Sequence, residues 1–233
     1  MRADNVGAPI EIRPRRGCGL STVLGLILIV VIGGLAALGS MLPEGESGLA
    51  GLLAPEPSGP RVGLIAGHWQ SDSGTVCPDG LQEVEVNLAI ARATAELLRA
   101  QGYRAEVLAE FDAALDGYQA AALVSIHCDS CLSALSGFKV ARFTGSAVPE
   151  TEDRLVQALY TAYAAGTGLE PHLNTITEDM RQYHAFRRIA AETPGAIIEA
   201  GFLGGDRHLL TAQQDRVARG IARGIEAFLE PSP

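Results

Sequence analysis

The chain has 233 residues, of which 47% are hydrophobic, and its formal net charge is −9 at pH 7. This length accommodates one ordinary domain with a sizeable core, together with appendages. The acidic balance argues against a nucleic-acid partner, because phosphate backbones are bound by basic surfaces.

An uncharged apolar segment occupies residues 20–42. Because crossing the hydrocarbon core of a bilayer takes about 20 residues, we predict a transmembrane helix there. Arg13, Arg15 and Arg16 lie just before this segment, and basic residues flank the cytoplasmic end of a membrane span. The sequence therefore predicts a cytoplasmic tail at residues 1–19 and an extracytoplasmic location for everything after the span.

A cleaved signal peptide is the alternative, because Ala37-Leu38-Gly39 offers small residues to a signal peptidase, and the protein would then be secreted. The apolar run is longer than a usual signal core, which favours the retained anchor. Residues 43–60 contain four prolines and four glycines and predict a flexible linker.

Residues 61–233 alternate between short apolar runs, typical of buried strands, and apolar residues spaced three and four apart, typical of helices. The expected strands are residues 61–66, 103–108, 121–126, 195–198 and, with a weaker pattern, 137–143; the expected helices are residues 84–102, 150–165 and 214–229. This alternation predicts an α/β domain with a mostly parallel, doubly wound sheet that has helices on both faces.

Polar residues follow three of the expected strands. His68 and His127 come after apolar runs, and Glu199 ends a third one. Since ligands bind at the carboxyl ends of parallel strands, we expect these side chains to converge. Two histidines with one carboxylate are typical of catalytic zinc sites, and Glu83 at a helix start supplies a candidate oxygen ligand. Glu199 then remains free as the general base.

Simpler structural roles stay open for these residues at this point. A histidine after a strand is often only hydrogen-bonded, and Glu83 and Glu85 would both stabilise a helix N-terminus. Glu199 is harder to explain in this way, because a carboxylate beside an apolar run is costly to bury without a partner or a function.

Three cysteines, Cys77, Cys128 and Cys131, fall in the expected extracytoplasmic domain, where disulfides persist. We expect one bridge among them and one spare thiol, and the sequence does not choose the pair. Cys128 and Cys131 also have the spacing of a dithiol redox motif. A structural disulfide, with Cys77 as a candidate partner, is favoured because such redox motifs begin a helix.

Four segments together resemble the zinc-dependent N-acetylmuramoyl-L-alanine amidases of the amidase_3 type. The segments, in chain order, are LIAGHWQSDSG, GLQEVEVNLAIARATAELLRAQGY, LVSIHCDS and PGAIIEAGFLGG. The resemblance covers most of residues 61–229. It implies an enzyme that cuts the amide bond between muramic acid and the L-alanine of peptidoglycan, so it makes peptidoglycan the expected partner.

The resemblance also implies the role of each site residue. It makes His68, Glu83 and His127 ligands of Zn²⁺ and Glu199 the catalytic carboxylate, and it leaves Glu85 without a role. These assignments agree with those made from the residues alone.

The sequence departs from the family pattern at several positions. Residues 109–122 are short and lack arginine, Asp129 replaces an asparagine, and residues 69–71 replace a glycine-rich segment. These departures leave the substrate preference open and keep a catalytically inactive cell-wall-binding or regulatory protein as the alternative, with an unknown protein partner in either case. Five further residues have no definite role: His172, His184 and His208, and Arg187 and Arg188, which suit either a stem-peptide carboxylate or a solvated helix face.

Overall fold

A computed structural model describes residues 58–230 of the chain. The expected cytoplasmic tail and membrane span, and most of the expected linker, lie outside the described residues. Within residues 58–230, no helix is both long and apolar enough to cross a membrane.

The domain is built on one five-stranded sheet with the strand order β2-β1-β3-β5-β4. Four neighbouring strands pair in parallel, and β4 pairs with β5 in the antiparallel direction, which confirms the mostly parallel sheet. The strands are β1 (Arg61–Ala66), β2 (Arg104–Leu108), β3 (Ala122–Asp129), β4 (Lys139–Ala141) and β5 (Gly195–Phe202).

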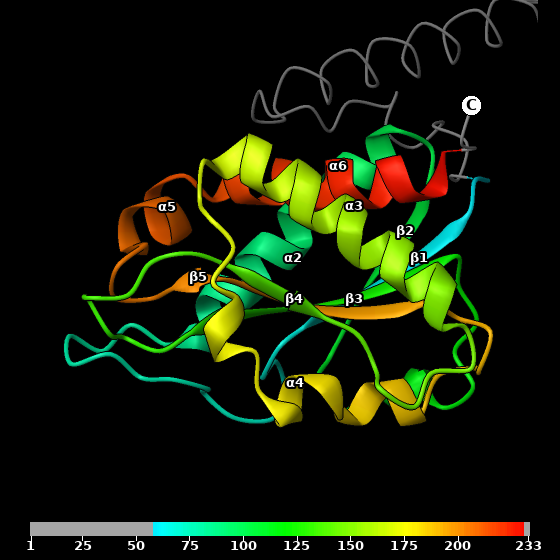
Figure 1. Cartoon of the computed structure of the whole chain (residues 1–233), viewed down its shortest axis with the longest axis horizontal. Coiled ribbons are helices and arrows are strands. Elements are labelled where there is room, and N and C mark those ends of the chain that lie inside the picture. The colour runs from blue at the N-terminus through cyan, green and yellow to red at the C-terminus, as the bar shows by residue number, and fades with distance from the viewer. Residues whose placement is uncertain (1–57, 231–233) are drawn as a thin grey trace, which may run out of the picture. The chain divides into compact units, whose positions relative to one another are not determined.

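Helices cover the two faces of the sheet unequally (Figure 1). The long helices α2 (Glu83–Ala100), α3 (Pro149–Thr167) and α6 (Gln214–Leu229) pack on one face. The short α4 (Glu178–Arg181) covers the other face together with 3₁₀ turns at Ala113–Leu115 and His184–Arg187. The expected doubly wound sheet is therefore present in an uneven form, because the connection from β2 to β3 holds only a 3₁₀ turn. The remaining elements are α5 (Arg207–Ala212), which follows β5, and a 3₁₀ turn at Leu173–Thr175.

The alternation of side chains along the strands divides the core into two clusters. In β3, Val124 and Ile126 pack under the long helices, whereas Leu123 packs toward α4. Because successive strand residues point to opposite faces, Ser125 and His127 share the face of Leu123. The site residues of β3 thus lie on the thinly covered face of the sheet.

Some element boundaries differ from those expected. β3 and β5 continue beyond the apolar runs, so His127 and Glu199 lie within strands and not after them. Helix α2 begins at Glu83, which makes this glutamate its first residue. The short helices α4 and α5 were not predicted, because four to six residues carry too little periodicity.

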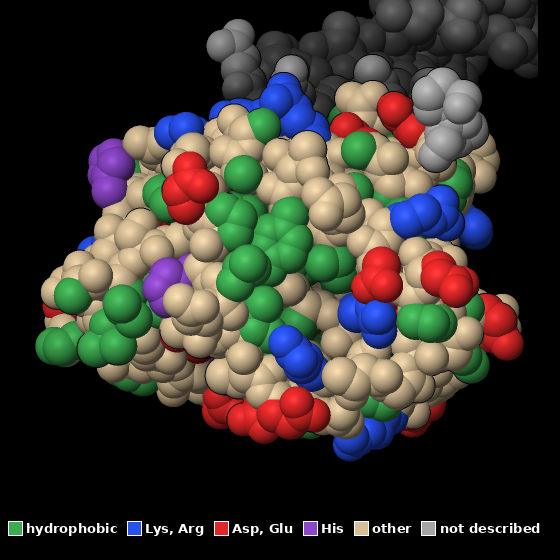
Figure 2. All heavy atoms as spheres, viewed as in Figure 1, with side chains coloured by type: hydrophobic (Ala, Val, Ile, Leu, Met, Phe, Trp, Pro, Cys, Tyr) green, Lys and Arg blue, Asp and Glu red, His purple; other side chains and the backbone are tan. Residues whose placement is uncertain are grey.

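The surface over α3, α6 and β4 is chemically mixed. Figure 2 shows hydrophobic side chains gathered near the centre of this face, with acidic and basic side chains interspersed around them. This face has no continuous basic surface.

Candidate metal centre

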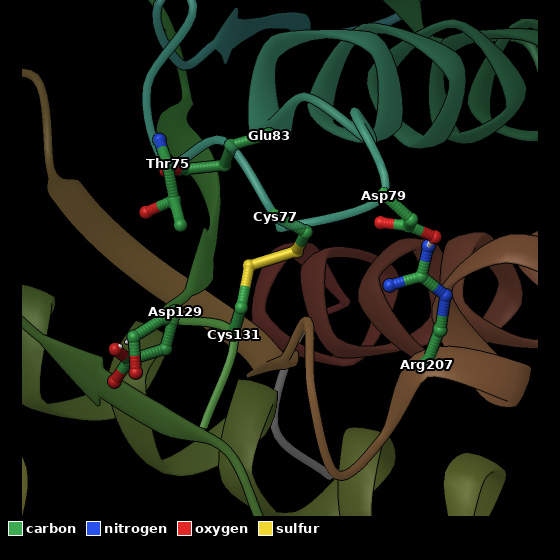
Figure 3. The surroundings of a disulfide bond; sticks show 8 residues. Thr75, Cys77, Asp79, Glu83, Asp129, Cys131 and Arg207 are labelled. Carbon is green, nitrogen blue, oxygen red and sulfur yellow. Dashed lines mark hydrogen bonds and ion pairs between the residues drawn. A yellow bond between two sulfur atoms is a disulfide. The ribbon is translucent and has the colours of Figure 1, made fainter. Parts of the chain in front are cut away.

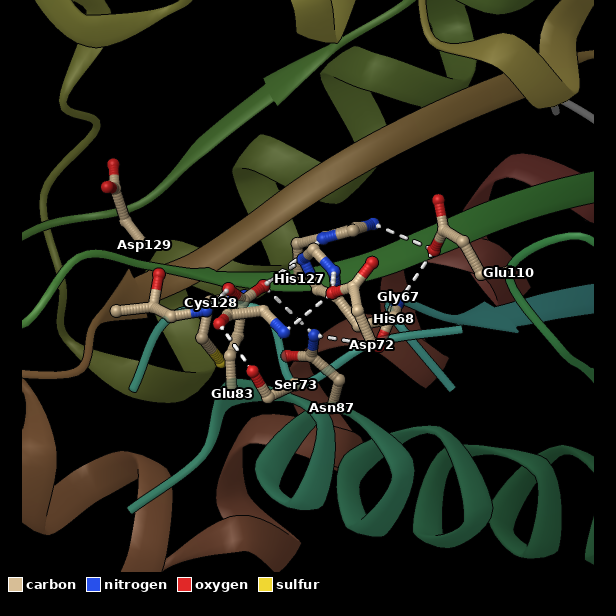
Figure 4. A network of polar contacts seen from close by, with 12 residues as sticks. Gly67, His68, Asp72, Ser73, Glu83, Asn87, Glu110, His127, Cys128 and Asp129 are labelled. Atoms are coloured by element: carbon tan, nitrogen blue, oxygen red, sulfur yellow. Dashed lines mark hydrogen bonds and ion pairs between the residues drawn. The ribbon is translucent and has the colours of Figure 1, made fainter. Parts of the chain in front are cut away.

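His68, Glu83 and His127 come together at the carboxyl edge of the sheet, as the sequence predicts. One potential donor atom from each of the three side chains lies within 4.8 Å of the other two. His68 follows β1, Glu83 begins α2, and His127 lies in β3. Figure 4 shows the three side chains pointing toward one another. Glu85, two residues further along α2, is exposed and takes no part in this group.

One carboxylate oxygen faces both histidines. Glu83 Oε1 lies 3.3 Å from His68 Nε2 and 3.2 Å from His127 Nδ1. Burial alone would raise the pKa of Glu83, but the contacts with His127 and His68 outweigh it and hold the pKa well below its usual value. The contact with Glu83 in turn raises the pKa of His68 to about 9.

The lowered pKa of Glu83 and the raised pKa of His68 both mean that the cluster stabilises positive charge on the histidines. The contacts with Glu83 favour the protonated, positively charged form of both histidines when no metal is bound. A divalent cation would supply positive charge in place of these protons and release them, as metal binding to histidine ligands does. Two nitrogens and one carboxylate oxygen form a donor set that suits zinc and leaves a coordination position for water.

Neighbouring residues hold the three side chains in place. The Asn87 amide donates hydrogen bonds to Glu83 Oε1 (3.1 Å) and to the Gly67 carbonyl oxygen (3.2 Å). A Cβ atom at Gly67 would lie 2.4 Å from the His127 ring, so only glycine leaves room for the imidazole. His68 has a positive φ of 67°, and its Nδ1 lies 2.6 Å from Asp72 Oδ1. Such a carboxylate orients the ring and leaves Nε2 free to bind a metal.

Glu199 lies beside this group but is not part of it. It is the register partner of His127 on β3 and of Lys139 on β4. The side chain is half-buried, and its Oε2 is shielded from solvent without a hydrogen-bond partner among residues 58–230. Removal from water raises the pKa of Glu199 to about 7, against the opposing effect of His127. A carboxylate with this pKa is suited to accept and return a proton near neutral pH.

Glu110 is a site residue that the sequence analysis missed. It follows β2 at the same edge of the sheet and is buried, with its Oε2 accepting a 2.8 Å hydrogen bond from the His68 backbone N–H. The rule that identified His68 and His127, a polar residue at the carboxyl end of a strand, would also have identified Glu110.

A disulfide joins Cys77 to Cys131, and Cys128 is a free, buried thiol. The alternative of a redox motif formed by Cys128 and Cys131 is therefore wrong, because Cys131 pairs with Cys77. The bond connects the segment before Glu83 to the segment after His127 (Figure 3). The same view shows an ion pair between Arg207 and Asp79 beside the disulfide.

The five residues left without a role have different surroundings, and among them only His184 contacts Glu110. His184 Nε2 is 2.8 Å from Glu110 Oε1, and His172 Nδ1 is 2.8 Å from Thr175 Oγ1. His208 is exposed. Arg188 pairs with Asp116, and Arg187 lies over the Phe143 ring. Neither arginine belongs to the metal-ligand group.

Exposed apolar side chains lie on the loops at this edge of the sheet. Within the described part of the chain, the large hydrophobic residues with more than half of their surface exposed are all on such loops: Val76 (54%), Phe111 (60%), Leu132 (57%) and Leu173 (58%). Apolar groups that remain exposed around a polar centre are typical of a binding site.

Comparison with known proteins identifies the relatives of this domain. Residues 62–227 match the family model for N-acetylmuramoyl-L-alanine amidase. No curated protein matches the chain. Among solved structures, the amidase Ami1 from Mycobacterium smegmatis has a TM-score of 0.62 at 20% identity, with 75% of this chain and 99% of that chain covered.

Two further solved structures are similar. The CwlD amidase from Clostridioides difficile, in complex with the GerS lipoprotein, has a TM-score of 0.58 at 20% identity. The match covers 73% of this chain and 98% of the CwlD chain. The catalytic domain of the amidase CwlV from Bacillus (Paenibacillus) polymyxa var. colistinus has a TM-score of 0.54 at 25% identity, with coverage of 72% and 97%.

Proposed function

Because this chain belongs to the N-acetylmuramoyl-L-alanine amidase family, we propose that it hydrolyses the bond between muramic acid and L-alanine with a zinc ion held by His68, Glu83 and His127. Amidase activity on peptidoglycan follows from the family. The identity of the metal and the role of each residue are parts of the proposal. The observation that carries it is the solvent-shielded Glu199 Oε2, without a hydrogen-bond partner in the described residues, beside a three-residue metal-ligand group.

The residues of this chain supply the proton transfers. When bound, zinc would supply Lewis acidity, lowering the pKa of a water molecule and polarising the carbonyl of the scissile amide. Glu199 accepts a proton from the water that attacks this carbonyl and then donates it to the nitrogen of the leaving L-alanine. Asp72 holds the His68 ring, and Asn87 holds the Glu83 carboxylate, so that the ligands stay oriented during turnover.

The membrane location is a second part of the proposal. Residues 20–42 anchor the chain as a single-pass protein with its N-terminus inside, and the catalytic domain lies outside the cytoplasmic membrane. The Cys77–Cys131 disulfide supports an extracytoplasmic location, because such bonds persist in oxidising compartments. Whether the N-terminal segment is instead cleaved can be read from the N-terminal sequence of the protein isolated from cells.

The test compares the parent with Glu199→Gln. We expect one zinc ion per chain in both proteins, and we expect the variant to release stem peptide from purified peptidoglycan about 10²–10⁴-fold more slowly than the parent. Full activity of Glu199→Gln would refute the base role. Zinc binding by the parent without any release would support the cell-wall-binding alternative, and absence of zinc would refute the metal centre.

A further inference from the structure

Glu110 makes more contacts than a structural carboxylate at a loop start requires. Its Oε2 accepts the His68 backbone N–H at 2.8 Å, and its Oε1 accepts the Tyr183 hydroxyl at 2.8 Å. His184 Nε2 lies 2.8 Å from the same Oε1. The Ser125 hydroxyl donates to Tyr183 Oη at 3.0 Å. Both carboxylate oxygens are therefore held by donors from several segments, which fixes the side chain in one orientation.

The His127 ring has a different neighbour at each nitrogen. Nδ1 lies 3.2 Å from Glu83 Oε1, in the metal-ligand group, whereas Nε2 faces Glu110 Oε2 at 3.6 Å. Nε2 is shielded from solvent and has no hydrogen-bond partner among residues 58–230. Figure 4 shows Glu83 and Glu110 on opposite sides of the ring.

A histidine that binds a metal through one nitrogen must carry its proton on the other. That N–H group is normally donated to a carboxylate or carbonyl, which fixes the tautomer and strengthens the ligand. If Nδ1 of His127 coordinates the metal, the proton lies on Nε2, and the carboxylate that this nitrogen faces is Glu110.

We propose that Glu110 is a positioning residue that accepts the Nε2–H of His127 and the backbone N–H of His68 through one oxygen, and so orients both histidine ligands for the metal. The inference rests on the proposed metal centre and adds a residue to it. The distance of 3.6 Å is longer than a hydrogen bond, so the proposal requires these two atoms to be closer together in the metal-bound protein.

The backbone conformation of His68 gives the Glu110 carboxylate a reason to contact this residue as well as His127. Its φ of 67° lies in the left-handed region, which costs energy for a residue other than glycine. The hydrogen bond from its N–H to Glu110 offsets part of that cost and holds the residue next to His127, whose ring centroid lies 4.9 Å from that of His68.

The experiment measures zinc affinity of the full-length chain by competition with a chromogenic chelator, and the visible spectrum of the cobalt-substituted protein. We expect Glu110→Gln to bind zinc about 10–100-fold more weakly, as loss of an orienting carboxylate does, and to change the cobalt spectrum. Glu106→Gln is the matched control on β2, because Glu106 pairs with Arg61 away from the centre, and it should keep the parent affinity.

The outcomes separate this inference from the proposed function. If the parent binds zinc and releases stem peptide, but Glu110→Gln keeps its zinc affinity and cobalt spectrum and only melts earlier, Glu110 is structural and the inference is wrong. If the parent binds no zinc, both ideas fail.

A second measurement does not depend on the folding of a variant. Nitrogen-15 NMR of the histidine side chains in the zinc-loaded parent reports which ring nitrogen is metallated, with the His127 signals assigned through their couplings to the His127 backbone. We expect zinc on Nδ1 and a proton on Nε2. Zinc on Nε2 would overturn the role of Glu110.

Discussion

Glu199 on β5 and His127 on β3 are direct register partners in the parallel sheet. Their side chains therefore leave the sheet on the same face, and the backbone places the carboxylate that we propose as the base beside a proposed metal ligand, without help from a loop. Sites held by strands are more rigid than sites held by loops, which suits a base that must meet a metal-activated water.

The burial of Glu199 predicts a pH-dependent penalty on folding. Its pKa is raised from 4.5 to about 7 in the folded protein. The folded protein therefore accommodates the neutral carboxyl better than the charged carboxylate. The stability that the neutral form gives is fully present below the unfolded pKa of 4.5 and is lost as the pH rises through about 7. In metal-free protein, we expect Glu199→Gln to increase the free energy of unfolding by about 2–3 kcal/mol at about pH 8.5, and by less than about 1 kcal/mol at about pH 5.

Urea unfolding of the chelator-treated parent and variant at both pH values measures this difference. Glu85→Gln provides a control, because Glu85 is exposed. An equal effect of Glu199→Gln at the two pH values would show that Glu199 is not destabilised in its charged form.

The first turn of α2 offers a matched pair of glutamates. Glu83 belongs to the group that could hold a metal, whereas Glu85 is exposed. We expect Glu83→Gln to weaken zinc binding by more than about 100-fold, since loss of a ligand should exceed the loss of an orienting partner. Glu85→Gln should bind zinc as the parent does. Equal zinc affinity of the two variants, measured by chelator competition, would contradict the assignment.

Gly67 tests whether the orientation of His127 matters apart from its identity. In Gly67→Ala, the new Cβ would lie 2.4 Å from the His127 ring, so the ring must leave its observed position. We expect zinc affinity to fall by about 10-fold or more, because ligand orientation controls affinity. Circular dichroism would show whether the fold is kept; a folded variant with the parent's zinc affinity would count against the observed ring position.

The Cys77–Cys131 bond closes a long loop, with a sequence separation of 54. Replacing both cysteines by serine should lower stability by about 2–4 kcal/mol, chiefly by freeing the unfolded chain, and lower the melting temperature by about 5–15 °C. Reductant should lower the melting temperature of the parent but not that of the double variant. Peptide mapping without reduction should recover Cys128 as a thiol; a Cys128–Cys131 peptide would show that the pairing is wrong.

The sequence by itself predicted the five strands and the three long helices, and it pointed to four candidate site residues. Short apolar runs are recognisable because buried strands exclude polar side chains, and His68, His127 and Glu199 stood out where such runs ended. The place of Glu83 at a helix start made it a candidate ligand, but Glu85 could be set aside only through the family resemblance, because both glutamates favour the start of a helix. The structure supplies the physical reason for that choice: the first residue of α2 turns toward the sheet edge, and Glu85 turns toward solvent.

Only the tertiary structure decided the cysteine pair, the uneven cover of the sheet and the contacts of Glu110. Each depends on segments far apart in the chain: Cys77 meets Cys131, and Glu110 meets Tyr183 and His184. Local patterns report which face of an element is buried, because that depends on periodicity. They do not report which distant residue lies against that face, because the chain topology and the packing of the elements decide which segments become neighbours.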